Sequence, residues 1–212
     1  VALAGQDKPG GFSFVPILFY TPETSIAAGA SPLYLFPADA RTRQSSLIGV
    51  MIYTLENQAQ GFATWTHYFR NNSASLKTTV DGKHFPSKFY GLGDATREED
   101  EEHFLEDSLR LETTFLLGLG RALKLGIRLE HESLWVREQR PGGLLDAGGI
   151  PGADGSRVTG LGLQFSRDTT DDAFYPLRGS AITGSLTRYQ SWPGSGHGYT
   201  AFLLDARAYL PL

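Results

Sequence analysis

Apolar and polar residues alternate along most of this chain. The clearest example runs from residue 104 to 136, where leucine, isoleucine and phenylalanine alternate with charged and hydroxyl side chains. Successive side chains of a strand point to opposite faces, so a period of two predicts strands, whereas a helix would spread the charges around its circumference. We therefore predict a long hairpin that turns near Gly120, with one face formed by Leu105, Leu109, Leu111, Phe115, Leu117, Leu119, Leu123, Leu125, Ile127 and Leu129.

The same pattern predicts about ten strands in all. Tight turns are expected at residues 71–73 and near Gly120, where asparagine, serine and glycine gather, and long loops at residues 85–103 and 137–157. Short and long connections are thus expected to alternate along the chain. The predicted strands are 14–22, 25–37, 45–56, 60–70, 74–84, 104–119, 122–136, 157–167, 180–191 and 198–210.

The strands are longer and more strictly two-faced than those of most soluble sheets. Many exceed the usual 5 or 6 residues, and a strand that crosses an outer membrane needs about 9 to 11. Aromatic residues near the predicted strand ends suit the girdles of a membrane barrel. We therefore predict an all-β, antiparallel, up-and-down transmembrane β-barrel. A soluble barrel, with an apolar core and a charged outer face, is the alternative.

Composition excludes several classes of protein. The 212 residues contain 25 glycines and no cysteine, so neither a disulfide framework nor a thiolate metal site is expected. The formal net charge of −4 argues against nucleic acid as a partner. Residues 1–12 are interpreted as the remnant of a signal peptide and a short leading segment, because Ala2-Leu3-Ala4 has the form that a signal peptidase cuts after; a chance alanine-rich start is the alternative. Residues 13–212 then form the barrel domain.

Charged residues of both signs fall on the predicted inward face of the last strands. Directly opposed charges of opposite sign stabilise a sheet, so they are expected to form a cross-strand network that lines the lumen. These residues are Arg110, Glu112, Lys124, Arg128, Glu130, Glu132, Asp205 and Arg207.

Three segments resemble the BamA/TamA-type outer-membrane barrels of the bacterial surface antigen superfamily. Residues 15–30 contain Tyr-Thr-Pro-Glu-Thr-Ser, similar to the opening hairpin of members that begin directly with the barrel. Residues 85–94, FPSKFYGLGD, and residues 167–179, RDTTDDAFYPLRG, resemble two further segments, the last being the turn between strands eight and nine. The resemblance implies a bacterial outer-membrane location, membrane lipid as a partner, and contact with other outer-membrane or periplasmic proteins.

The resemblance also implies a longer barrel. Family barrels have sixteen strands, and their hallmark Arg-Gly-Phe or Arg-Gly-Tyr loop follows the eleventh. We therefore expect this chain to hold ten of sixteen strands and to lack both that loop and the preceding POTRA domains; a complete ten-stranded barrel is the alternative.

The turn at residues 167–179 is expected to be structural. Gly179 can adopt a positive φ and Pro176 restricts the backbone, while Arg167 and Asp168 are expected to pair or to bind backbone groups at the barrel rim. The remaining residue that carries the resemblance is Phe174.

Candidate functions fall into three classes. The first is an outer-membrane barrel that assembles or translocates proteins, or that serves as a pore or platform. The second is a soluble, secreted ligand-binding barrel. The third is an outer-membrane enzyme such as a lipase, which would need a serine and a histidine on one strand face, and no such pair is evident. The sequence thus predicts no enzyme, no cofactor and no metal site, since the common catalytic and metal-binding motifs are missing.

Overall fold

The computed structural model describes residues 7–22, 25–94, 96–120, 122–147, 149–150, 152–171, 175–191 and 198–210. It contains ten strands and two single-turn 3-10 helices, η1 (Arg70–Asn72) and η2 (Glu98–Asp100). Each predicted strand is present, with ends that differ by a few residues. The strands are β1 (Gly11–Thr21), β2 (Ser25–Leu35), β3 (Ser46–Thr54), β4 (Ala59–Tyr68), β5 (Ala74–Phe89), β6 (Glu102–Gly118), β7 (Leu123–Arg137), β8 (Ser156–Asp168), β9 (Gly179–Ser191) and β10 (Tyr199–Tyr209).

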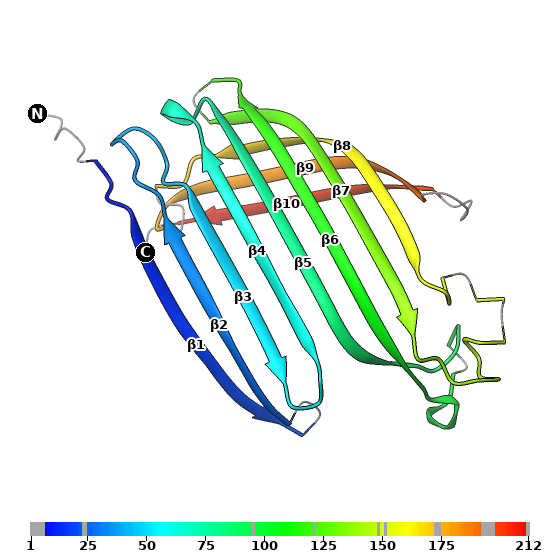
Figure 1. Ribbon diagram of the computed structural model, residues 1–212. Helices are drawn as coiled ribbons and strands as arrows, with labels where there is room; N and C mark the ends of the chain where they lie inside the picture. Colours follow the sequence, from blue (N-terminus) through cyan, green and yellow to red (C-terminus); the bar gives the residue numbers. More distant parts are fainter. Residues whose placement is uncertain are drawn as a thin grey trace, which may run out of the picture.

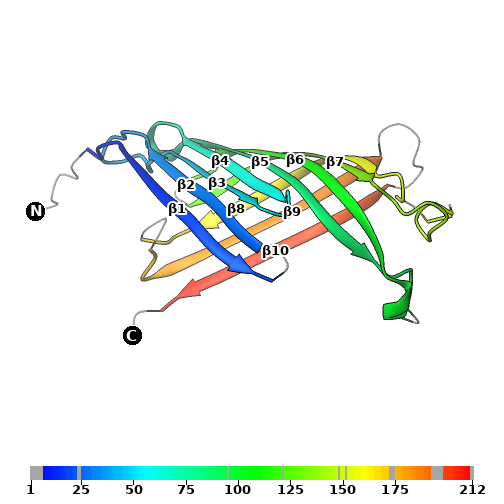
Figure 2. The same ribbon diagram turned by 60° about the horizontal axis from the view of Figure 1, so that its bottom comes forward.

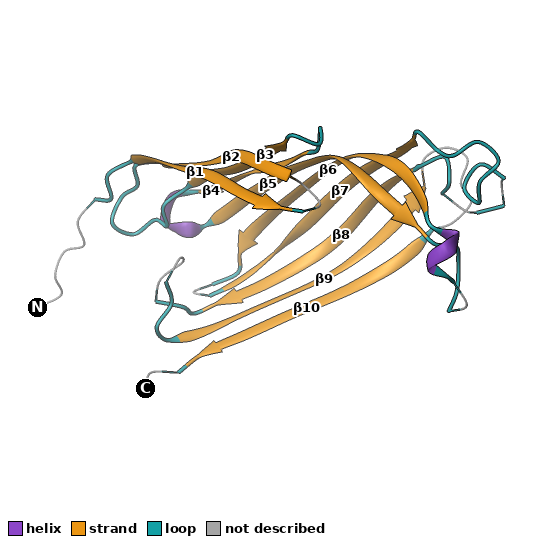
Figure 3. Cartoon of the chain, turned by 90° about the horizontal axis from the view of Figure 1, so that it is seen from below, coloured by secondary structure: helices purple, strands orange, loops and turns teal. Residues whose placement is uncertain are grey.

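All ten strands form one antiparallel sheet in which each strand pairs with the next along the chain. The sheet curls strongly, so that β8, β9 and β10 lie behind the first strands in Figure 1 and below them in Figures 2 and 3. No pairing joins β1 to β10 among the described residues. The antiparallel up-and-down sheet predicted from the sequence is therefore confirmed, as an open, deeply curved trough.

The two faces of the trough follow the alternation of the sequence. Ile127 of β7 pairs with Phe115 of β6 and with Leu163 of β8, and Leu163 pairs with Leu186 of β9, which makes one outward row. These side chains are open to the surroundings, with Ile127 54% and Leu163 61% exposed. By contrast, few apolar side chains are buried among the described residues: Ala27, Ala74, Leu116, Leu145 and Ala153. From β6 to β9 this row of large apolar side chains thus lies on the convex surface, not in a core.

The concave face is not polar throughout. Val50 of β3 pairs with Phe62 of β4, Phe62 with Asp81 of β5, and Asp81 with Arg110 of β6. These residues share one face, so apolar side chains on β3 and β4 continue into charged ones on β5 and β6. Only the later strands have the polar concave face that the sequence predicts for the lumen.

The connections depart from a simple alternation of short and long. Residues 90–101 and 138–155 form long loops at one end of the sheet, and the turns at residues 69–73 and 119–122 lie at the other end. The first loop is shorter than the predicted 85–103, because β5 continues to Phe89. However, the loops 36–45 and 169–178 also lie at this second end, and neither is a tight turn. They have the length to reach across the mouth of the trough.

Two tyrosines near strand ends, Tyr68 and Tyr199, face the concave side and so lie away from the outer face that a girdle would occupy. The ring of Tyr68 lies 5.2 Å from Lys124 Nζ, and Tyr199 stacks on Tyr189 with ring centroids 4.6 Å apart. Tyr189 in turn donates a hydrogen bond to the inward carboxylate of Glu130. These rings can lie on the polar face because each has a polar partner there, a cation for Tyr68 and hydroxyl hydrogen bonding for the Tyr189–Tyr199 stack, which offsets the cost of placing an aromatic ring among polar groups.

Candidate functional site

The concave face holds a cavity of about 840 Å³ beside the end of the sheet that carries loops 36–45 and 169–178. Its walls come from β4 to β10 and from these two loops, so it depends on the curvature of the whole sheet. Charged and hydroxyl side chains predominate in the lining, which includes Arg43, Tyr68, Ser75, Lys77, Glu112, Thr114, Lys124, Arg128, Gln164, Ser166, Asp168, Thr183, Asp205 and Arg207.

Four of the predicted lumen charges form a compact network on β6 and β7. Glu130 is 4% exposed and accepts from Arg110 at 2.5 Å and from Arg128 at 2.9 Å. Arg128 also contacts Glu112 at 2.9 Å, and the Tyr189 hydroxyl donates to Glu130 at 2.7 Å. Each carboxylate thus has at least two cationic neighbours within reach. This dense pairing offsets the cost of removing charges from water.

Among the remaining predicted charges, Glu132 lies opposite Arg110 across the β6–β7 pair but is exposed and makes no ion pair in the described part of the chain. The other three stand apart from this network. Lys124 Nζ donates to Ser75 Oγ at 3.3 Å and has no ion-pair partner among the described residues. Asp205 and Arg207 pair with each other along β10 at 2.8 Å, with both side chains largely exposed. The predicted charges thus include one cross-strand network on β6 and β7 and one separate pair on β10, and they do not join into a single network.

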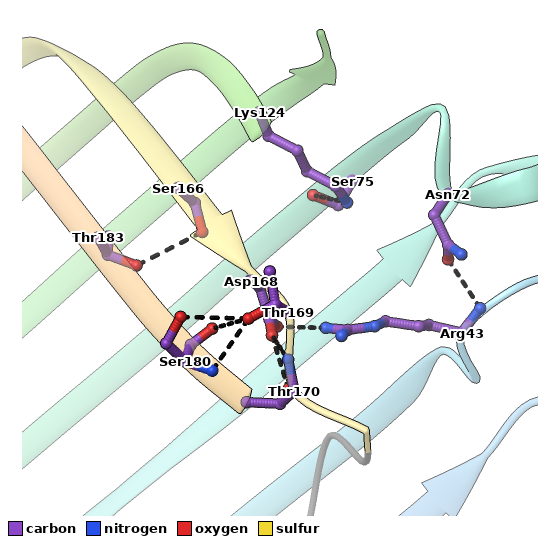
Figure 4. A network of polar contacts seen from close by, with 10 residues as sticks. All are labelled: Arg43, Asn72, Ser75, Lys124, Ser166, Asp168, Thr169, Thr170, Ser180 and Thr183. Atoms are coloured by element: carbon purple, nitrogen blue, oxygen red, sulfur yellow. Dashed lines mark hydrogen bonds and ion pairs between the residues drawn. The ribbon is translucent and has the colours of Figure 1, made fainter. Parts of the chain in front are cut away.

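A second polar cluster crosses the trough at the mouth of the cavity (Figure 4). Arg43 reaches from loop 36–45 to Asp168 at the end of β8, with Nη1 and Oδ2 2.5 Å apart. Asp168 also accepts from the backbone N–H of Thr170 at 2.9 Å and from its hydroxyl at 2.6 Å. Because β3 and β8 are not neighbours in the sheet, this ion pair joins the two walls directly.

The loop that carries Arg43 is held in place by its own hydrogen bonds. Asp39 Oδ1 accepts from the backbone N–H of Arg41 and of Thr42, both at 2.8 Å. The hydrogen bond from the Thr42 hydroxyl, together with these backbone contacts, lowers the pKa of the Asp39 carboxyl. The Asn72 side chain accepts from the backbone N–H of Arg43 at 2.7 Å and donates to the Arg41 carbonyl at 3.0 Å. The hydrogen bond to Asp168 raises the pKa of the Arg43 guanidinium, which therefore stays charged.

The turn at residues 167–179 behaves only in part as predicted. Gly179 has a φ of +109°, and a Cβ there would lie 2.4 Å from the Thr169 carbonyl oxygen, so glycine is required. Asp168 binds backbone as expected, but its ionic partner is Arg43. Arg167 points to the opposite face, with Nη1 3.4 Å from Ser180 Oγ. Pro176 lies in the β8–β9 loop, and Phe174 falls outside the described residues.

In the acidic run at residues 97–103, Glu99 and Glu101 form surface ion pairs at the other end of the sheet. Glu102 is buried instead and accepts from the backbone N–H groups of Leu144 and Leu145. Glu101 accepts from Lys88, His103 and the Tyr90 hydroxyl, and the hydrogen bonds from Lys88 and Tyr90 lower the pKa of the Glu101 carboxyl. In the part of the chain that the structure describes, no group of histidine and acidic side chains has the arrangement of a metal site. Nor does any helix there have the length and apolar character needed to cross a membrane.

The sequence did not reveal Arg43 or Tyr189 as members of the polar clusters. Arg43 lies in a loop with no alternating pattern, and its partner is 125 residues away. Tyr189 is one of many aromatic residues in the predicted strands, and its sequence neighbours do not mark it as a partner of Glu130. The one usable signal was the period of two, which places Tyr189 on the same face of β9 as Thr187.

Comparison with known protein families and with curated proteins gives no match to this chain.

Proposed function

We propose that this chain forms the wall of a β-barrel in a bacterial outer membrane, with its convex face against lipid and its concave face toward water. The observation that carries the proposal is the outward apolar belt. On β7 it consists of Leu123, Leu125, Ile127 and Leu129, all more than 40% exposed, and it continues on the neighbouring strands. In water such a continuous belt would be a large unfavourable surface, whereas lipid solvates it.

The concave face supports the same orientation. Arg110, Arg128 and Glu130 would be costly to place against hydrocarbon, but they are paired and they face a cavity open enough to hold water. Backbone groups give a third argument, since a sheet in lipid needs partners for both edges. We therefore propose that β1 and β10 are paired in the assembled barrel, with each other or with further strands.

The family resemblance supports a narrower proposal, membership of the surface antigen superfamily. Residues 15–30 fall on the β1–β2 hairpin, and residues 167–179 fall on the connection between β8 and β9, the place that the resemblance implies. Within that superfamily, the present geometry favours a pore or a platform for other outer-membrane proteins, because a polar cavity lies inside the trough. Depletion of the protein followed by quantification of the outer-membrane proteome tests a role in protein assembly, and unchanged levels of all other barrels would contradict that role.

Membrane integration is tested by folding the chain into detergent, transferring it to liposomes and floating these on a density gradient. We expect the protein to float and to stay with the vesicles after an alkaline carbonate wash, which strips peripheral proteins. A monodisperse, detergent-free monomer that sediments away from the vesicles would contradict the proposal.

A further inference from the structure

A serine and a histidine share the outward face of β7, in contrast to the sequence-based expectation that no such pair exists. His131 Nε2 lies 3.1 Å from Ser133 Oγ, and His131 Nδ1 lies 2.8 Å from Thr159 Oγ1 on β8. In the tautomer that protonates Nδ1, the imidazole donates to Thr159, and Nε2 accepts from the Ser133 hydroxyl. This is the relation of nucleophile, base and orienting group that activates a serine.

A cation stands next to the serine. Ser133 pairs across the sheet with Arg157 of β8, which is exposed and has no hydrogen-bond or ion-pair partner within the described ranges. Directly opposed side chains have Cβ atoms about 5 Å apart, so the guanidinium can reach an oxygen bound at Ser133. It could stabilise the oxyanion that forms when the serine attacks a carbonyl.

The position of these residues along β7 indicates the substrate. The outward positions run through Leu125, Ile127 and Leu129 and then change to His131 and Ser133, with Trp135 next. The pair therefore lies where the apolar belt ends, and a tryptophan at such a border is typical of the lipid headgroup level. Ester bonds of membrane lipids lie at that depth, with apolar chains on one side and anionic phosphate on the other.

We propose that Ser133 and His131 form a hydrolytic site on the outer wall of the sheet, with membrane lipid esters as substrates. Ser133 Oγ bonds to the ester carbonyl carbon while its proton passes to His131 Nε2. The bond to the leaving oxygen then breaks, and that oxygen takes the proton from Nε2 and departs as the alcohol. Water attacks the acyl-serine by the same route, which releases the fatty acid and restores the hydroxyl. Thr159 is a positioning residue.

Access to the serine requires movement of its neighbours. Ser133 is 6% exposed and is flanked by Leu109 of β6 and Arg157 of β8. Both flanking side chains are exposed, so they can swing aside when a lipid binds. A covalent probe that reports on Ser133 itself therefore tests the site better than turnover alone.

The first test is labelling of the detergent-folded chain with an alkyl fluorophosphonate, located by peptide mass spectrometry. We expect the label on Ser133. His131→Gln should slow labelling by ~100-fold or more, the usual contribution of a general base. Thr159→Val should slow it by up to ~100-fold through loss of imidazole orientation, and Thr159→Ser, which keeps the hydroxyl, should restore it. Thr113→Val is the matched control, since Thr113 is an outward hydroxyl bonded to Thr78 at 3.3 Å with no histidine beside it.

The second test measures fatty-acid release from dioctanoylphosphatidylglycerol in mixed micelles. We expect release by the original chain and by Thr113→Val, loss with Ser133→Ala, and a lower kcat with Arg157→Gln, since the guanidinium acts on the oxyanion that forms only during the reaction. No label on Ser133 of the wild-type chain, with its strand content verified by circular dichroism, would overturn the site. Label on Ser133 without fatty-acid release would overturn the assignment to lipid esters. Both readouts are made in detergent, so their failure is distinguishable from failure of membrane integration.

Discussion

Arg43 and Asp168 meet across the open trough, with Nη1 and Oδ2 2.5 Å apart, although 125 residues separate them in sequence. Strand pairing joins each strand only to its neighbours in the sheet. Without a contact between the two walls of the trough, the sheet could therefore flatten. Loop 36–45 supplies that contact, and the bonds from Asn72 to its backbone fix the direction in which Arg43 points.

Removal of this ion pair should loosen the curvature of the sheet. Arg43→Gln is expected to lower the free energy of unfolding by about 1–3 kcal/mol, because the partly buried Asp168 loses its charged partner. The measurement is urea unfolding in detergent, with a double-mutant cycle through Asp168→Asn. Arg97→Gln is the control, since its ion pair with Glu99 is solvent-exposed. Equal effects of the two arginine variants would contradict this role.

The network around Glu130 should be the most sensitive part of the concave face. Glu130→Ala leaves Arg110 and Arg128 without their closest carboxylate and should cost about 3–5 kcal/mol of unfolding free energy. Tyr189→Phe removes one hydrogen bond and should cost about 1 kcal/mol. Glu132→Gln, at an exposed position of the same strand, is the control. The prediction fails if Glu132→Gln and Glu130→Ala destabilise equally.

The turn between β8 and β9 should not tolerate a side chain at residue 179. Gly179→Ala combines a positive φ with a Cβ 2.4 Å from the Thr169 carbonyl oxygen, so we expect a loss of about 1–3 kcal/mol or more. Gly11→Ala is the matched control because a Cβ there meets nothing within 4 Å. Thermal unfolding of both variants checks the prediction, and a neutral Gly179→Ala would contradict the described backbone.

Loop 36–45 should weaken in acid. The pKa of Asp39 in the folded chain lies below its ordinary value of 3.8, so its ionised form stabilises the fold above that value, and the contribution disappears as the pH falls through the lowered pKa. Unfolding free energies of the original chain and of Asp39→Ala should therefore converge as the pH falls below ~4. A difference that stays constant down to pH ~2 would show that the charge of Asp39 plays no part.

The sequence predicted the strands and their faces because both depend on local alternation. Ile127 and Arg128 point to opposite sides because adjacent residues of a strand do so, and the apolar and polar residues around them alternate in the same way. The two long loops were predictable from their glycine, proline and acidic residues. The strand count also placed residues 167–179 between β8 and β9, as the structure has them.

Long-range contacts were out of reach of the sequence. Nothing near Arg43 indicates Asp168 as its partner, and by sequence the adjacent Arg167 is as good a candidate partner for Asp168. The relation of His131 to Ser133 was present in the sequence at a spacing of two residues. The spacing alone does not indicate a functional pair, because Thr159 joins it only through the register of β7 and β8.

The central claim is that lipid covers the convex face, and cysteine scanning of β8 tests it most directly, since the chain has no cysteine of its own. Proteins with a single cysteine at residue 163, 164, 165 or 166 would be reconstituted into liposomes and then treated with a membrane-impermeant maleimide. In the bare sheet the outward side chains are the more open ones, with Leu163 61% and Phe165 37% exposed, while Gln164 and Ser166 line the cavity. We predict the reverse order of labelling, with positions 164 and 166 reactive and 163 and 165 protected. Rapid labelling at 163 and 165 in liposomes would contradict the account.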